Sequence, residues 1–205
     1  MNYIEFKEKM FDLACFSNDQ VYSWRPDFDR NNLSRWIKKG LLIRLRQGYF
    51  TFPEYKGKPD YAWYFANRMY RPSYISLHSA LSFHGIIPES VIQITSVTSL
   101  KTAYFVNPFG EYSYKTIKKE MMSGYVLKTL SDGRTLQIAD AEKALSDLLY
   151  LYPEYSTTQD MLDLRLDEEY LQNDLKMNLL HEYISEFKSK ALEKRVNQLI
   201  IAYRL

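Results

Sequence analysis

The chain has 205 residues, of which 46% are hydrophobic, and its formal net charge is +2. Its single cysteine, Cys15, excludes an internal disulfide framework, and no run approaches the roughly 20 apolar residues that a membrane span needs. The charged opening MNYIEFKEKM lacks the apolar stretch of a signal peptide, so we expect a cytoplasmic protein with one compact domain and a small additional module.

The first predicted element is a helix over residues 3–16. Phe6, Met10 and Leu13 are expected to face inward, which makes this helix part of a small three-helix core. Cys15 falls in this apolar helix, and we expect it to be a small core residue.

A second helix is predicted to begin at Ser17. Ser17 and Gln20 fit a capping box, in which the serine hydroxyl and the glutamine side chain each bind a backbone amide of the first turn. Val21 and Trp24 face one side of it. The helix should span only about two turns, because Pro26 biases Arg25 away from helical geometry.

The third helix follows, with Asp27 or Asp29 as its cap, and Gly40 ends it. Leu33, Trp36 and Ile37 fall within one narrow arc and should be buried. The outward arc carries Asn31, Ser34, Arg35, Lys38 and Lys39. Asparagine pairs bidentately with adenine and arginine with guanine, so this face has the chemistry for reading base edges in a major groove.

A hairpin is predicted next, with Gln47 and Gly48 as its turn and Tyr49 at the start of the returning strand. Alternation along the first strand places Arg44 and Arg46 on the solvent face. Residues 25–48 hold seven basic and two acidic side chains, a local net charge of +5. A basic helix face and hairpin edge also serve solubility and edge protection, which is the simpler alternative to a nucleic-acid surface.

The segment LSRWIKKGLLIRLRQGYF resembles the N-terminal winged helix of the AbiEi-type antitoxins of type IV toxin-antitoxin systems. ISLHSALSFHGIIPES, ITSVTSLKT, GEYSYKTIK, LQIADAEKALSDLLYL and LDLRLDEEYL resemble the blocks that follow in that family, so the resemblance spans nearly the whole chain. It implies a bacterial regulator that binds its own promoter, at repeated sites, and neutralises a nucleotidyltransferase-like toxin without necessarily touching it.

A boundary is predicted at PEYKGKPD, which divides the chain into residues 1–57 and 58–205. Helices are expected over YAWYFANRMY, residues 76–84, DAEKALSDLLYLY and the tail from about Asp167. Strands are expected at VIQITSV, TAYFV, YSYKTI, GYVLKTL and RTLQIA, the last two joined in a hairpin through Asp132 and Gly133. Asp140 should cap its helix, whose apolar stripe is Ala141, Ala144, Leu145, Leu148 and Leu149.

Two alternatives concern the larger domain. Asp140, Glu142 and Lys143 follow a strand, as the carboxylates of some metal-dependent nucleases do, although acids at a helix start also satisfy free amides and the helix dipole. Rings at Tyr104, Phe105, Phe109, Tyr112 and Tyr114, with Lys115, Lys118 and Lys119 nearby, suit either sheet packing or stacking on single-stranded nucleic acid.

The sequence therefore predicts an α+β protein, with an N-terminal winged helix-turn-helix and a mixed α/β domain that ends in a helical tail. We expect a sequence-specific, duplex-DNA-binding transcriptional regulator without a cofactor, a metal or an enzymatic activity, acting as an antitoxin and autorepressor. The expected DNA-binding residues are Asn31, Ser34, Arg35, Lys38, Lys39, Arg44, Arg46 and Tyr49. The alternatives are a metal-dependent nucleic-acid-processing enzyme centred on Asp140 and Glu142, or a protein- or RNA-interaction module.

Overall fold

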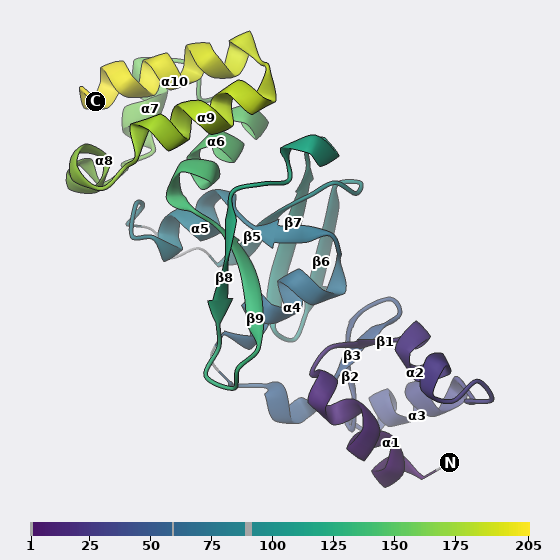
Figure 1. The fold of residues 1–205 in the computed structure, drawn as a ribbon. Coiled ribbons are helices and arrows are strands. Elements are labelled where there is room, and N and C mark those ends of the chain that lie inside the picture. The colour runs from purple at the N-terminus through teal and green to yellow at the C-terminus, as the bar shows by residue number, and fades with distance from the viewer. Residues whose placement is uncertain (1, 59, 89–91) are drawn as a thin grey trace.

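The structure is a computed structural model, and it describes residues 2–58, 60–88 and 92–205. Those residues form an α+β fold with two sheets (Figure 1). A three-stranded sheet of order β1-β3-β2 lies near the N-terminus, and a six-stranded mixed sheet of order β6-β7-β5-β4-β9-β8 occupies the middle. The C-terminal helices lie at the end of the molecule opposite to the N-terminus.

The described residues hold ten α-helices and nine strands. The helices are α1 (Tyr3–Met10), α2 (Asn18–Trp24), α3 (Asn31–Lys38), α4 (Tyr61–Met69), α5 (Leu77–Phe83), α6 (Ala141–Leu151), α7 (Thr158–Asp163), α8 (Glu168–Asn173), α9 (Met177–Phe187) and α10 (Lys190–Tyr203). The strands are β1 (Phe16–Ser17), β2 (Ile43–Arg46), β3 (Tyr49–Thr51), β4 (Ser73–Ile75), β5 (Gln93–Thr98), β6 (Ala103–Asn107), β7 (Gly110–Thr116), β8 (Tyr125–Thr129) and β9 (Thr135–Ala139).

Aromatic rings form the core of the N-terminal unit, by which we mean residues 2–52, from α1 to the end of the hairpin. Phe6 is fully buried at its centre. The Phe6 ring centroid lies 4.6 Å from that of Trp36 on α3 and 5.6 Å from that of Phe16 on β1. Burial of such large rings is the main stabilising term for a unit this small, so α1 holds α3 and the sheet together.

The predicted helix signals of this unit are confirmed except for the cap of α3. Both hydrogen bonds of the capping box between Ser17 and Gln20 are made at the start of α2. Arg25 leaves the helix with φ −140° and ψ 96°. The prediction that Asp27 or Asp29 caps α3 is wrong, because Arg30 occupies the N-cap without a side-chain cap bond, although Asp29 accepts a hydrogen bond from the Asn31 amide at 2.9 Å. Gly40 follows α3 at φ +70°, where a left-handed C-terminal cap favours glycine.

The predicted helix over residues 3–16 is wrong in its second half. α1 ends at Met10, a single 3-10 turn follows over Phe11–Leu13, and Ala14 has φ +58°. Phe16 then pairs with Phe50 in the three-stranded sheet, which competes with helix continuation. Leu13, expected inside, is 36% exposed, whereas Cys15 is buried as predicted, but after the helix rather than within it.

The five strands predicted from the sequence correspond to β5 to β9. Residue 91, where the first of them was expected to begin, lies outside the described residues. The β8–β9 hairpin turns through Asp132 and Gly133 as predicted, closed by a 2.7 Å hydrogen bond from the Leu130 amide to the Arg134 carbonyl. β5 runs parallel to β7, and β4 runs antiparallel to β5 but parallel to β9, so the sheet is mixed.

The sequence did not predict β4, although it lies inside the sheet between β5 and β9. It has only three residues, all of them buried. A strand buried on both faces shows no alternation of polar and apolar residues, and three residues are too few for a periodic pattern.

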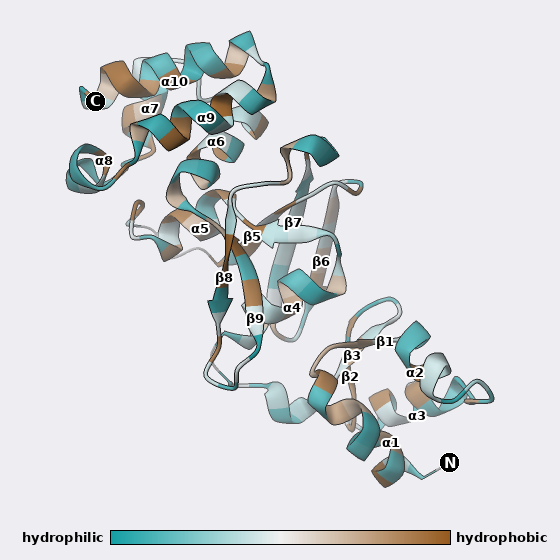
Figure 2. Ribbon diagram, viewed as in Figure 1, coloured by the Kyte–Doolittle hydropathy of each residue, from teal (hydrophilic) through white to brown (hydrophobic). Residues whose placement is uncertain are grey.

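Helix α6 connects the sheet to the C-terminal helices. It packs against α5 and β9 of the sheet region, and also against α9 and α10 of the C-terminal helices. Residues 141–149 of this helix are all buried. Figure 2 shows hydrophobic and hydrophilic bands along α9 and α10, as expected for helices that pack with one side only. Within the described ranges, no helix has both the length and the apolar character that crossing a bilayer requires.

Gly124 permits the close approach of α6 and α9 beside the start of β8. A Cβ atom at this position would lie 2.8 Å from both Lys143 Cγ and Tyr183 Cζ, and its φ of +69° is unfavourable for any residue with a side chain. We predict that Gly124→Ala lowers the free energy of unfolding by about 2–4 kcal/mol, measured by urea denaturation, through overpacking and backbone strain together.

Gly133 provides the matched control for this prediction. Its φ of +84° is similarly positive, but a Cβ atom there would meet no atom within 4 Å. Gly133→Ala should therefore cost only the backbone strain, about 1 kcal/mol. Equal losses in the two variants would show that the approach of Lys143 and Tyr183 to Gly124 is not a tight contact.

Candidate nucleic-acid interface

The outward side of α3 is polar and open to solvent. All five side chains expected on this face are exposed: Asn31, Ser34, Arg35, Lys38 and Lys39. Leu33 and Trp36 on the opposite side are buried and Ile37 is half-buried, so the amphipathic pattern predicted for this helix is confirmed. The helix is anchored by its apolar side and leaves the amide and guanidinium groups of Asn31 and Arg35 accessible.

Several basic groups around α3 have no opposite charge beside them. Arg30, Lys38, Lys39 and Arg44 are exposed and form no ion pair with any described residue. Arg25, in contrast, is paired with Glu5, with Nη2 and Oε1 2.9 Å apart. Unpaired exposed cations retain their full attraction for an external anion, because no protein carboxylate already neutralises them.

A groove separates the first half of α3 from the hairpin. Its volume is about 460 Å³, and the polar residues lining it are Arg30, Asn31, Ser34, Arg44, Gln47 and Gly48. Arg30 and Arg44 come from its two opposite sides, one before α3 and the other on β2. The groove can therefore present cationic and amide groups together to one extended, negatively charged ligand.

The expectation that Arg46 lies on the solvent face is wrong. The β2–β3 register shifts between Arg44 and Arg46, a β-bulge that breaks the strict alternation on which the expectation rested. Arg46 is half-buried, its Nε donates to the Met69 carbonyl, and its guanidinium lies 4.0 Å from the ring centroid of Tyr49. Tyr49, also expected at the DNA surface, is half-buried and serves as the platform for this cation–π contact.

The contacts of Arg46 belong to a junction between the N-terminal unit and the rest of the molecule. The Arg46 guanidinium lies 5.6 Å from the ring centroid of Phe105 on β6. Asn107, at the end of β6, donates to the Leu45 carbonyl at 3.1 Å. Arg134 Nη2, in the β8–β9 turn, donates to the Asp12 carbonyl at 2.5 Å. These polar contacts fix the hairpin against the larger sheet.

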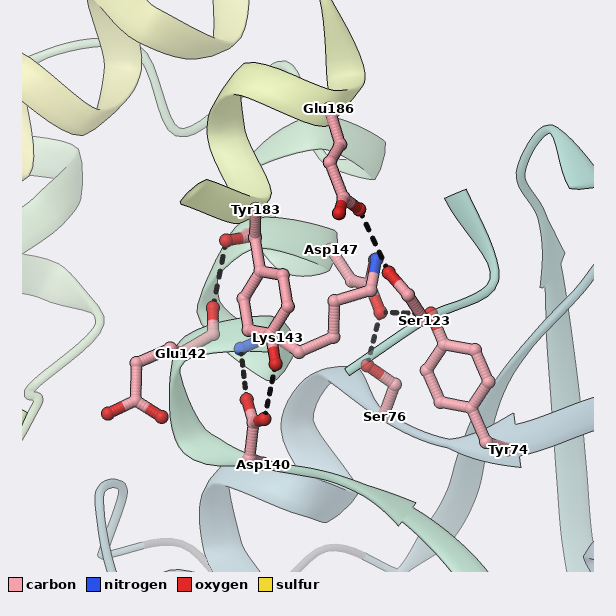
Figure 3. Close-up of polar contacts among 10 residues, drawn as sticks. Tyr74, Ser76, Ser123, Asp140, Glu142, Lys143, Asp147, Tyr183 and Glu186 are labelled. Atoms are coloured by element: carbon pink, nitrogen blue, oxygen red, sulfur yellow. Dashed lines mark hydrogen bonds and ion pairs between the residues drawn. The ribbon is translucent and has the colours of Figure 1, made fainter. Parts of the chain in front are cut away.

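Asp140 and Glu142, the carboxylates of the alternative metal-site hypothesis, are both engaged at helix starts. Asp140 accepts from the Lys143 amide and from the Tyr183 hydroxyl, each at 2.7 Å, so the predicted cap on α6 is confirmed (Figure 3). Glu142 accepts from the Lys176 amide at 2.8 Å, just before α9. Among the described residues, no three His, Cys, Asp or Glu side chains gather closely enough to hold a metal ion.

A buried ion pair that the sequence did not reveal lies one turn further along α6. Lys143 Nζ and Asp147 Oδ1 are 2.6 Å apart, with side chains 1% and 0% exposed (Figure 3). The other oxygen, Asp147 Oδ2, accepts from the hydroxyls of Tyr74 and Ser76, each at 2.8 Å. Burial raises the pKa of the Asp147 carboxyl, and the nearby Lys143 ammonium opposes that rise.

Both side chains are closed off from solvent, so this pair is a packing element rather than a site open to substrate. The i,i+4 spacing of the two residues was visible in the sequence. The apolar stripe predicted for α6 includes neither residue, and a helical period cannot show that α9 and the region of β4 cover them. The i,i+4 spacing of a lysine and an aspartate therefore indicates a buried pair only when the elements packed against the helix are known.

The rings proposed for single-stranded nucleic acid do not form a stacking platform. Tyr112 and Tyr114 point to the same side of β7 as predicted, but both are fully buried. The Tyr114 hydroxyl donates to the Ala66 carbonyl on α4 at 2.7 Å, which identifies these rings as sheet-to-helix packing. Tyr104 is exposed, and its hydroxyl donates to Glu111 at 2.7 Å.

No family model matches the chain, and comparison with curated proteins likewise finds no match.

Removing one member of the buried pair should be far more costly than removing both. We predict that Lys143→Met lowers the free energy of unfolding by about 3–5 kcal/mol, because Asp147 is left as an uncompensated buried charge. The double variant Lys143→Met/Asp147→Leu should be more stable than this single variant. A double variant that is no more stable than Lys143→Met would contradict the reading of the two groups as one unit.

The loss in Lys143→Met should also depend on pH. Burial raises the pKa of the Asp147 carboxyl and the Lys143 ammonium opposes that rise, so in the variant the folded state takes up a proton still more readily than in wild type. Stability of the variant relative to wild type should therefore recover as the pH falls through that raised pKa. Thermal melting of both proteins over a descending pH series measures this trend, and a difference between the proteins that does not change with pH would contradict it.

Proposed function

We propose that the protein is a transcriptional regulator that binds duplex DNA, with α3 in the major groove and the β2–β3 hairpin beside the adjacent phosphate backbone. One observation supports this most directly: the exposed polar side of α3 is surrounded by basic residues that have no ion-pair partner among the described residues. A major groove about 12 Å wide admits one helix in this way.

The order of elements in the N-terminal unit supports the same proposal. α1, β1, α2, α3 and the β2–β3 hairpin follow one another as the parts of a winged helix-turn-helix do, and we assign the unit to that fold. On this assignment α3 is the recognition helix and the hairpin is the wing. The wing is short, since only Gln47 and Gly48 separate its two strands.

The side chains divide into two roles by their chemistry. Asn31 and Arg35 on α3 have the paired donors and acceptors that read base edges, with Ser34 between them. Lys38, Lys39, Arg30 and Arg44 are suited to phosphate contacts, which position a protein without specifying sequence. Arg46 and Tyr49 support the wing from the junction instead of contacting DNA directly, because both are held in the cation–π contact described above.

The physiological setting is proposed from the resemblance to AbiEi-type antitoxins. On that basis the DNA would be the protein's own promoter with repeated sites, and the chain would neutralise a nucleotidyltransferase-like toxin. Direct contact with the toxin is not required by this proposal, since control of toxin synthesis and protection of the toxin's nucleic-acid substrate are both indirect routes.

Electrostatic binding through α3 and the wing should be strongly salt-dependent. For the full chain on a promoter fragment, we predict that log affinity falls against log salt concentration with a slope of about −3 to −4, one phosphate for each unpaired cation. Fluorescence anisotropy over a salt series measures the slope. Arg204→Ala, which removes an exposed positive charge from the far end of the chain, is the control and should leave the slope unchanged.

Arg35→Ala and Arg44→Ala separate recognition from positioning. Arg35→Ala should cost about 1–3 kcal/mol on the preferred sequence and reduce discrimination against random DNA, because a bidentate base contact is lost. Arg44→Ala should weaken binding to all sequences alike and reduce the salt slope by about 1. Indistinguishable effects of the two variants on specific and random DNA would refute the assignment of α3 and the wing.

A further inference from the structure

A small polar pocket lies on the larger part of the molecule, between the end of α4 and the β8–β9 hairpin. Its volume is about 160 Å³, and its lining residues are Asn67, Arg68, Arg71, Leu127, Thr135 and Gln137. None of the six is acidic, and two carry a guanidinium. The volume is several times the roughly 30 Å³ that one water molecule occupies, so a group larger than water fits.

Asn67, one of the residues that line this pocket, has a hydrogen-bond donor without a partner among the described residues. The residue is only 5% exposed, and its Oδ1 accepts a hydrogen bond from the Gln137 amide. That bond identifies the oxygen, so the other end of the side chain is the NH2 group, which has no partner among the described residues. A buried donor left without a partner costs free energy, and a ligand that accepts from it removes that cost.

The two arginines are also available for an anion. Neither Arg68 nor Arg71 forms an ion pair with any described residue. Arg68 lies over the Tyr64 ring, 5.0 Å from its centroid, a contact that orients the guanidinium and leaves its donors unused. The positive charges of Arg68 and Arg71 also act on the Cys15 thiol, which places both near the same junction. A small pocket lined by two guanidinium groups and an amide matches the oxygens of a phosphate group.

A second, larger cavity adjoins this pocket through the same two arginines. Its volume is about 420 Å³, and Arg68 and Arg71 line both spaces. Its other walls come partly from the N-terminal unit, through Ser17, Gln20 and Tyr49. The lining combines the rings of Tyr49 and Tyr64 with polar and charged residues that include Ser17, Gln20, Asp12 and Arg134. This mixture suits the organic part of a small molecule.

We propose that this pocket binds the phosphate group of a small phosphorylated molecule, whose organic part occupies the adjoining cavity between α4 and the N-terminal unit. A ligand placed in this way touches both sides of the junction. It stabilises their contact by mass action, since it binds the folded arrangement only. The phosphate pocket is distinct from the proposed DNA surface, because none of its six residues lies on α3 or the wing, although Tyr49 of the wing lines the adjoining cavity.

The test uses the full chain and two probes, inorganic phosphate and AMP, titrated calorimetrically at constant ionic strength. Both should bind saturably, with AMP about tenfold tighter or more because it also fills the larger cavity. The absence of saturable binding of either probe up to about 10 mM would overturn the proposal. Equal affinities for the two probes would overturn the assignment of the larger cavity to the organic part.

Asn67→Asp is the most specific variant. Aspartate retains the oxygen that accepts from the Gln137 amide but replaces the NH2 donor with a negatively charged acceptor. It should weaken AMP binding at least about tenfold. Arg71→Ala, at an exposed position where folding is not at risk, should do the same. If a folded Arg71→Ala variant binds AMP as tightly as wild type does, the proposed phosphate site is wrong. This outcome holds even if Asn67→Asp fails to fold.

Arg44→Ala is the matched control, since it removes an arginine from the proposed wing and not from the pocket. It should bind AMP as wild type does while losing DNA affinity, and Arg71→Ala should show the reverse. Failure of DNA binding with intact AMP binding would refute only the proposed function. Displacement of AMP by one equivalent of duplex DNA would overturn the small-molecule proposal, because the pocket would then be part of the DNA surface.

Discussion

The Lys143 ammonium and the Asp147 carboxylate lie together where water is excluded, and such charges are tolerated only when their hydrogen bonds are made. Asp147 meets this condition through Lys143, Tyr74 and Ser76, which come from α6 and from the region of β4. The Lys143 ammonium also lies 4.5 Å from the Phe187 ring centroid on α9. Turning α6 by one residue, about 100°, would bury both charges among apolar groups, so the pair fixes the rotation of this helix between sheet and C-terminal helices.

A comparable constraint acts at the other end of the sheet. Arg46 binds the Met69 carbonyl and lies over Tyr49, so the hairpin is held by the same element, α4, that packs on the larger sheet. α3 presents its polar side next to this hairpin. A helix that must enter a groove benefits from being held rigidly, since less conformational entropy is then lost on binding.

The features predicted correctly from the sequence are those that depend on a few neighbouring residues. The capping box at Ser17, the cap at Asp140 and the buried side of α3 each need only a local hydrogen bond or a helical period. The errors arose where a distant partner decides the conformation. Phe16 became a strand residue because Phe50 pairs with it, and Arg46 turned inward because of a bulge and the rings around it. At the candidate interface the residues of α3 were identified correctly as exposed, whereas of the hairpin residues only Arg44 is exposed as expected, and Arg46 and Tyr49 are half-buried.

The burial of Cys15 has a consequence for how the junction can be observed. The thiol is 7% exposed, and burial raises its pKa to about 12. Because the thiolate is the reactive form, very little reactive sulfur is present at neutral pH while the junction is closed. Covalent labelling must then proceed through transient opening of the N-terminal unit, and its rate reports the free energy of that local opening. The only cysteine in the chain is thus a built-in kinetic reporter at the junction, which requires no engineered label.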